Sequence, residues 1–311
     1  MKLFDAHCHL QDPRIYNISH QLIKTAQDAG VIHISVNGVC EKDWQLVKEM
    51  SESHLCVIPN FGLHPWFIPH RTPNWLNLLK EFLESTPEAA VGEIGLDKAP
   101  WASHVDYTEQ VEVFRQQLQL AKDINRPASI HCVEAFDDMI EILKSFAPFP
   151  SGFLLHSYIG CAELVPQLAE LGAYFSISGH LMPMEESKAQ KILQAIPLER
   201  ILLETDAPDA LPKSLKSSGC FPMVGKKMSV VKGVLGGEEN SNYDGKIFDN
   251  VLHEEGDTSK LPKENLNHPA NNSHVLAYVA SLLEMDKGQL AEICYENARN
   301  IFSFEGSKIC A

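Results

Sequence analysis

Short hydrophobic runs alternate along this chain with longer segments in which hydrophobic positions recur every three or four residues. The short runs are mostly continuously apolar, which is typical of parallel strands buried on both faces. The longer segments carry one apolar face each and therefore predict amphipathic helices. In one of them, Val111, Phe114, Leu118 and Ala121 share such a face. The pattern predicts an alternating order of strands and helices.

Eight strand and helix units follow from this pattern. The predicted strands are 3–8, 31–37, 55–61, 89–95, 127–132, 152–157, 173–178 and 200–205. The predicted helices are 18–29, 43–53, 75–84, 108–124, 135–146, 162–171, 185–195, 273–285 and 287–302. Alternation implies a parallel sheet, and eight repeats imply closure into an α/β (β/α)8 barrel. We expect a single barrel domain over residues 1–311, while periodicity alone leaves a doubly wound open sheet as the alternative.

Five of the predicted strands end in side chains that bind divalent metal ions. These side chains are His7, His9, Glu93, His131, His156 and Asp206. In a barrel the C-terminal strand ends meet on one face, and the eighth strand lies beside the first. Asp206 could then join His7 and His9, whereas an open sheet would spread them apart. The placement of these side chains therefore favours the barrel.

Mixed imidazole and carboxylate ligands suit zinc, manganese, iron or magnesium, which activate water for hydrolysis. His7 and His9 are two residues apart on a strand, so their side chains point to one face. Glu93 lies at the end of a buried strand, where a carboxylate is costly unless it is paired or bound to a cation. Taken singly, His131 could be a core histidine and Asp206 could cap the next segment. Their shared position at one rim favours a metal site.

Charge and composition limit the partners. The formal net charge is −15 with no basic stripe, which argues against tight binding of long duplex DNA. For a phosphate-bearing substrate, bound metal would have to supply local positive charge. The eight cysteines are scattered without a C-x-x-C pair, so we expect a reducing compartment, the cytoplasm or else the nucleus. No apolar run could span a membrane, and we expect no signal peptide because the chain begins with a predicted strand.

The segment 213–262 interrupts the repeating pattern. It is rich in glycine, serine, asparagine and lysine and has few large apolar clusters. A loop of this length is usually a functional lid or a disordered segment. We expect a flexible insertion on the surface, or alternatively a lid over the mouth of the barrel.

Six motifs occur in an order that resembles a known family. They are Asp5-Ala6-His7-Cys8-His9, Gly62-Leu63-His64-Pro65, Gly92-Glu93-Ile94-Gly95-Leu96-Asp97, Ile130-His131-Cys132, Leu155-His156-Ser157 and Glu204-Thr205-Asp206-Ala207-Pro208. The set resembles the TatD-type metal-dependent deoxyribonucleases of the amidohydrolase superfamily. This resemblance implies a (β/α)8 barrel, two divalent ions (Mg, Mn or Zn) and hydrolysis of DNA phosphodiesters, often from the 3′ end. The expected substrates are DNA ends or short oligonucleotides, with no obligate protein partner.

The resemblance also implies roles for the motif residues. One ion would be held by His7, His9, Glu93 and Asp206, and Glu93 would bridge to a second ion held by His131 and His156.

The resemblance also implies two catalytic roles. Asp206 would act as general base for the attacking water. His64 would contact the scissile phosphate or the leaving oxygen, unless it is only packed within its Gly-Leu-His-Pro turn.

Several neighbours of these motifs depart from the family pattern. Val133 stands where the family has an arginine, Lys98 stands where an aromatic residue is usual, and His268 replaces an acidic residue. We hypothesise that Lys98 restores some of the positive charge lost at Val133. The ligand positions match the family pattern, whereas several of their neighbours do not. The sequence therefore supports metal binding more directly than it supports DNA as the substrate.

Two other functions remain as alternatives. One is a metal-dependent amidohydrolase or esterase acting on a small amide, ester or phosphoester. Such relatives often use a modified lysine as bridging ligand, so Glu93 favours the nuclease. The other is a non-catalytic binding protein, which six intact ligand positions disfavour. Few aromatic residues are candidates for base stacking near the mouth, namely Trp66 and Trp101.

Overall fold

Eight parallel strands form one sheet in a computed structural model that describes residues 1–213 and 266–309. Each strand pairs with the next strand of the chain. The strands are β1 (Leu3–Cys8), β2 (Val31–Asn37), β3 (Val57–Phe61), β4 (Ala90–Asp97), β5 (Ala128–Val133), β6 (Phe153–Leu155), β7 (Ala173–Ile177) and β8 (Ile201–Leu203). Almost every strand residue is buried, as the continuous apolar runs predicted.

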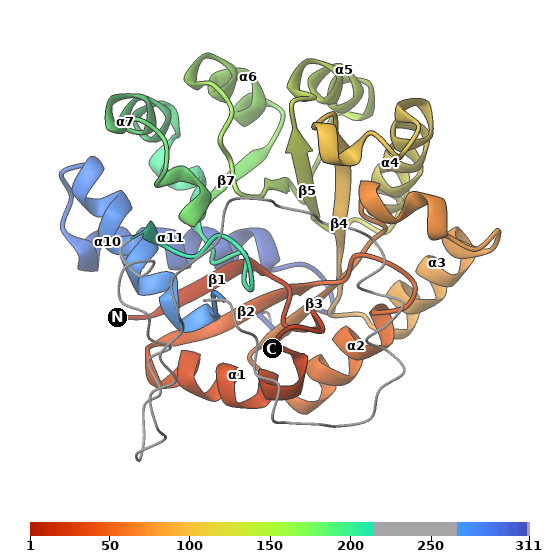
Figure 1. Cartoon of the computed structure of the whole chain (residues 1–311), viewed down its shortest axis with the longest axis horizontal. Helices are drawn as coiled ribbons and strands as arrows, with labels where there is room; N and C mark the ends of the chain where they lie inside the picture. The colour runs from red at the N-terminus through yellow and green to blue at the C-terminus, as the bar shows by residue number, and fades with distance from the viewer. Residues whose placement is uncertain (214–265, 310–311) are drawn as a thin grey trace, which may run out of the picture.

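The helices surround this sheet on its outer side, except for the last one, which packs across one end of the barrel (Figure 1). They are α1 (Ser19–Asp28), α2 (Trp44–Ser53), α3 (Trp75–Ser85), α4 (Tyr107–Asp123), α5 (Phe136–Phe146), α6 (Val165–Glu170), α7 (Glu186–Ala195), α10 (Asn272–Leu282) and α11 (Lys287–Phe302). The start of the predicted helix 162–171 is instead a 3-10 turn, Ala162–Leu164, which leads into α6. The other predicted helices are found with ends shifted by no more than three residues.

The predicted sixth and eighth strands, 152–157 and 200–205, are longer than the observed β6 and β8. Ser157 and Asp206 adopt left-handed backbone conformations, with φ of 45° and 52°, in the turns that follow these strands. His156 and Asp206 consequently lie just beyond their strands. The expectation that Glu93 ends its strand is wrong, because β4 continues through Asp97.

Hydrogen bonds just after β8 close the sheet against β1. The Asp206 N–H donates to the His7 carbonyl oxygen at 2.9 Å, and the His9 N–H donates to the Ala207 carbonyl oxygen at 2.7 Å. Asp5 accepts from the Thr205 N–H at 2.8 Å and from the Thr205 hydroxyl at 2.5 Å. The first and eighth strands are therefore neighbours, which confirms the (β/α)8 barrel and excludes the open sheet.

Apolar side chains fill one end of the barrel and leave the other end polar. Inside the sheet, Phe4 and Leu202 pack with the last turn of α11, where Phe302 stacks on Phe4 at a centroid distance of 5.2 Å. Burial of a side chain such as Phe302 stabilises the fold by about 1.5–3 kcal/mol. Because α11 covers the N-terminal strand ends, the C-terminal ends are left for the site.

Two further predictions concern the insertion and a possible membrane span. Positions 214–262 of the predicted insertion lie outside these residues. Within residues 1–213 and 266–309, every helix is too short or too polar to cross a lipid bilayer.

Candidate metal centre

Glu93 stands at the centre of the polar rim, and its two carboxylate oxygens face different histidines. Oε2 lies 3.5 Å from Nε2 of His7 and 3.3 Å from Nε2 of His9. Oε1 lies 3.1 Å from Nδ1 of His131 and 2.8 Å from Nε2 of His156. The structure thus gathers two histidine pairs, one on each oxygen of a single buried carboxylate.

The first histidine pair is oriented by contacts behind the rings. Nδ1 of His7 lies 2.9 Å from the Ser129 hydroxyl oxygen, and Nδ1 of His9 lies 2.8 Å from the Asn37 carbonyl oxygen. That carbonyl only accepts, so the His9 proton sits on Nδ1 in the neutral ring and leaves the Nε2 lone pair toward Glu93. Such contacts fix the tautomer of a metal-binding histidine.

The second pair is held by carboxylates. Nε2 of His131 lies 3.2 Å from Oδ2 of Asp97. Nδ1 of His156 lies 3.6 Å from Oε1 of Glu204, an ion-pair distance too long for a hydrogen bond. Glu204 is itself held by the Ser157 N–H at 2.6 Å and by the Ser157 hydroxyl at 2.7 Å. Each ring therefore turns its other nitrogen to Glu93.

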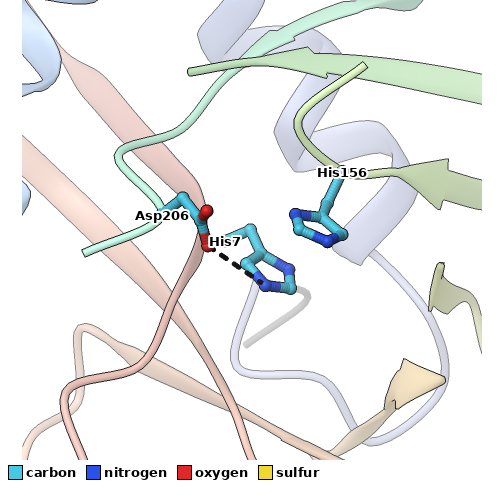
Figure 2. A group of neighbouring side chains, drawn as sticks. All are labelled: His7, His156 and Asp206. Carbon is cyan, nitrogen blue, oxygen red and sulfur yellow. Dashed lines mark ion pairs between the residues drawn. The ribbon is translucent and has the colours of Figure 1, made fainter. Parts of the chain in front are cut away.

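Asp206 lies near the first histidine pair, on the side of His7 that faces away from His156. Its Oδ1 lies 3.9 Å from Nε2 of His7 and 3.6 Å from Nε2 of His9. Figure 2 shows His7 between Asp206 and His156. The rings of His7 and His156 are stacked at a centroid distance of 4.1 Å. The other oxygen, Oδ2, lies 3.2 Å from Nε2 of His180. Asp206 thus offers one oxygen to the centre.

These side chains fit divalent ions. Three sets of possible ligand atoms each gather within 4.8 Å of one another: His7, His156 and Asp206; His7, His9 and Glu93; His64, Glu93 and His131. Burial acts to raise the pKa of the Glu93 carboxyl, but the histidines, His156 first, hold it well below its usual value. Asp206 is likewise held ionised against burial, first by His180. Two buried carboxylates with several histidine ring nitrogens around them form a donor set suited to cations once the rings have lost their extra protons.

His64 differs from the other rim histidines. The Trp66 N–H donates to its Nδ1 at 3.2 Å, so the neutral ring carries its proton on Nε2, which lies 3.5 Å from Oε1 of Glu93. Burial, outweighing the opposing effect of Glu93, lowers the pKa of His64 to about 3. Although its position fits the third set of ligand atoms, this tautomer makes His64 a hydrogen-bond donor.

Several residues around the centre were not anticipated from the sequence. They are Asn37, Ser129, His180 and Glu204, and their contacts to the predicted residues come from elements distant in the chain. Glu204 offered one signal, since a carboxylate two residues before Asp206 is expensive to bury without a partner. Lys98, the hypothesised source of positive charge, forms an ion pair with Asp138.

A parallel barrel with buried carboxylates and histidines gathered at its C-terminal rim defines the class of metal-dependent hydrolases. Within that class, the chain belongs to the TatD related DNase family, whose model matches residues 4–303. This membership confirms the family suggested by the motifs, and with it an enzyme that hydrolyses ester bonds.

Known relatives match over most of the chain. The uncharacterized metal-dependent hydrolase YabD of Bacillus subtilis is 27% identical over 300 residues, which cover 96% of this chain and 98% of that protein. A protein of a Pantoea species named 3′-5′ ssDNA/RNA exonuclease TatD is 30% identical over 220 residues, 68% of this chain and 82% of the relative. The crystal structure of the TatD homolog YJJV from Escherichia coli superposes with a TM-score of 0.76 at 21% identity, covering 97% and 98% of the two chains, which supports the fold.

Proposed function

We propose that this protein is a two-metal phosphodiesterase that removes nucleotides from the ends of single-stranded DNA or RNA. One observation carries the proposal: the two oxygens of Glu93 face separate histidine pairs, as a bridging ligand between two ions requires. The name of the Pantoea relative supports the substrate class and the 3′-to-5′ direction. The centre would hold one ion on His7, His9, Glu93 and Asp206, and a second on Glu93, His131 and His156.

Bound at these positions, two divalent ions supply Lewis acidity to the attacking water and neutralise charge on the phosphate. The protein side chains contribute orientation and proton transfer. Asp206 is ionised and can accept a proton from the attacking water. His64, neutral and protonated at Nε2, can donate a hydrogen bond to a phosphate oxygen or to the leaving oxygen. Because that ring is neutral, His64 positions the phosphate rather than supplying an imidazolium proton.

A direct assay tests the proposal. Purified protein is given single-stranded DNA and RNA oligonucleotides labelled at the 3′ or the 5′ end, with magnesium, manganese or zinc. We expect metal-dependent shortening from the 3′ end. The Glu93→Gln variant should lose at least about 100-fold in rate, since even partners of metal ligands contribute 10–100-fold. Glu199→Gln, at an exposed position, should match the wild type.

Two outcomes would count against the proposal. Hydrolysis of small amides or esters without cleavage of nucleic acid would favour the amidohydrolase alternative. Cleavage that persists in the Glu93→Gln variant would remove this site from the reaction. The cytoplasmic location and the absence of an obligate protein partner stay predictions from the sequence.

A further inference from the structure

Two tryptophans from neighbouring loops meet one carboxylate beside the candidate centre. Trp66 lies in the turn Pro65–His70 after β3, and Trp101 lies in the turn Pro100–Ala102 after β4. The Trp66 Nε1–H donates to Oδ2 of Asp97 at 2.7 Å, and the Trp101 Nε1–H donates to the same oxygen at 3.2 Å. That oxygen also lies 3.2 Å from Nε2 of His131. Both indoles are therefore anchored to the group that orients a proposed metal ligand.

The two indoles differ in their exposure. Trp66 is half-buried and packs edge-on against His64 and His131, at centroid distances of 4.9 and 6.1 Å. Trp101 is 51% exposed, and among the described residues it is the one aromatic side chain in the group of exposed large hydrophobics. Tryptophan usually hides most of its large apolar surface. The exposed indole, within two hydrogen bonds of His131, is therefore available to a ligand bound at the centre.

The position of Trp101 is fixed although its ring is exposed. Its N–H is held by Asp97, and its carbonyl oxygen lies 3.1 Å from Nδ1 of His104. Nε2 of the same histidine lies 3.3 Å from the Trp66 carbonyl oxygen, which links the two loops. An aromatic surface that is already ordered loses little conformational entropy when a ligand binds.

We propose that the exposed indole of Trp101 stacks on an unpaired nucleobase of the substrate whose phosphodiester lies at the metal centre. This inference rests on the proposed function and specifies how the single strand is recognised. Every base has a π-face, so stacking tolerates any sequence, whereas bases inside a duplex are already stacked on their neighbours. Affinity from stacking also suits a chain with a net charge of −15, because such a chain offers little electrostatic attraction to a phosphate backbone.

The test compares two oligonucleotides, one with all its bases and one whose last three residues at the 3′ end are abasic. For the first, Trp101→Ala should raise KM by about tenfold or more, with kcat nearly unchanged. For the abasic oligonucleotide, the wild type and Trp101→Ala should have equal KM. Trp101→Phe should restore most of the affinity, because phenylalanine keeps an aromatic face. Since phenylalanine lacks the N–H that reaches Asp97, this restoration would come from stacking and not from support of Asp97. Ser103→Ala, at an exposed position in the same loop, is the matched control.

Other results would overturn the inference. If Trp101→Ala lowers kcat, or impairs both oligonucleotides equally without rescue by phenylalanine, Trp101 only supports Asp97. Equal KM for the wild type and Trp101→Ala on the base-bearing oligonucleotide also refutes stacking.

A binding measurement separates this inference from the proposed function. If the wild type cleaves no nucleic acid, tryptophan fluorescence is titrated with the same two oligonucleotides. Quenching by the base-bearing one alone, lost in Trp101→Ala, supports stacking even though the proposed activity has failed. Absence of any quenching overturns both the stacking and the single-stranded ligand.

Discussion

At the candidate centre, the ring of His9 can bind either a proton or a metal ion. Burial acts to lower the pKa of His9, but Glu93 and Asp206 outweigh it and raise the pKa to about 9 in the metal-free protein. His9 is therefore protonated at neutral pH, while a metal ligand must offer a lone pair. A proton and a metal ion bound at the proposed site would compete for the same Nε2.

This competition predicts proton release on metal binding. Between pH 7 and about 9, each unit of increase in pH should strengthen manganese binding by up to about tenfold, because fewer His9 rings carry a proton. Above the pKa of about 9, the contribution of His9 should level off. Calorimetric titration in two buffers of different ionisation enthalpy measures the number of protons released. His20→Asn, at an exposed position on α1, should leave that number unchanged. Binding that is independent of pH, without proton release, would contradict the prediction.

The candidate ligand residues could be proposed from the sequence because the predicted barrel places them together at one rim. The histidine pair two residues apart and the glutamate in a buried strand added support from their own positions. The residues behind the ligands could not be predicted in this way. Ser129 meets His7 across 122 positions of chain, and His180 meets Asp206 from the loop after β7. Only the register of the strands brings such pairs together.

At the scale of elements, β4 and β5 approach each other closely where they carry the centre. A Cβ built on Gly95 would lie 1.9 Å from the His131 carbonyl oxygen, which is backbone and cannot move aside cheaply. Glycine at this position therefore sets the distance between the strand that bears Glu93 and the strand that bears His131.

Gly95→Ala should consequently push His131 away from Glu93. We expect a loss of manganese affinity of about 10-fold or more together with a loss of about 1–3 kcal/mol in the free energy of unfolding. Calorimetry and urea unfolding measure the two quantities. Gly288→Ala, in the first turn of α11, meets only the Asp286 side chain at 3.0 Å and should change little. A Gly95→Ala variant with normal metal affinity would show that the strands can separate without disturbing the site.

The hydrophobic pattern predicted where the elements lie better than where they end. Both observed ends of β2 agree with the prediction, and the strand is buried at Val31 and from Ile34 to Asn37. The end of β6 depends instead on a distant contact, since Glu204 accepts hydrogen bonds from the backbone and side chain of Ser157. No local pattern encodes that contact, so the prediction carried the strand too far.

For the whole molecule, the contacts between β1 and the segment after β8, called the seam here, close the barrel and also position residues of the candidate centre. Beside the bonds of His7 and His9 to the segment after β8, Asp5 holds Thr205 by two hydrogen bonds within the protein interior. Burial, offset in part by Thr205, raises the pKa of Asp5 well above its usual value. An asparagine side chain has nearly the same shape as this carboxyl group and keeps an oxygen that can accept from the Thr205 N–H.

Asp5→Ala should therefore open the seam, whereas Asp5→Asn should keep it. Alanine leaves the Thr205 N–H and hydroxyl without this acceptor, and each buried group left unsatisfied costs about 1–3 kcal/mol. We expect Asp5→Ala to lower the free energy of unfolding by about 3 kcal/mol and to weaken manganese binding, since Asp206 follows Thr205 directly. In Asp5→Asn, the side-chain amide can accept from the Thr205 N–H and donate to its hydroxyl oxygen, so both quantities should stay near the wild type. Urea unfolding and calorimetry of both variants decide the matter: normal metal binding in a destabilised Asp5→Ala protein would show that the seam holds the barrel but does not place Asp206.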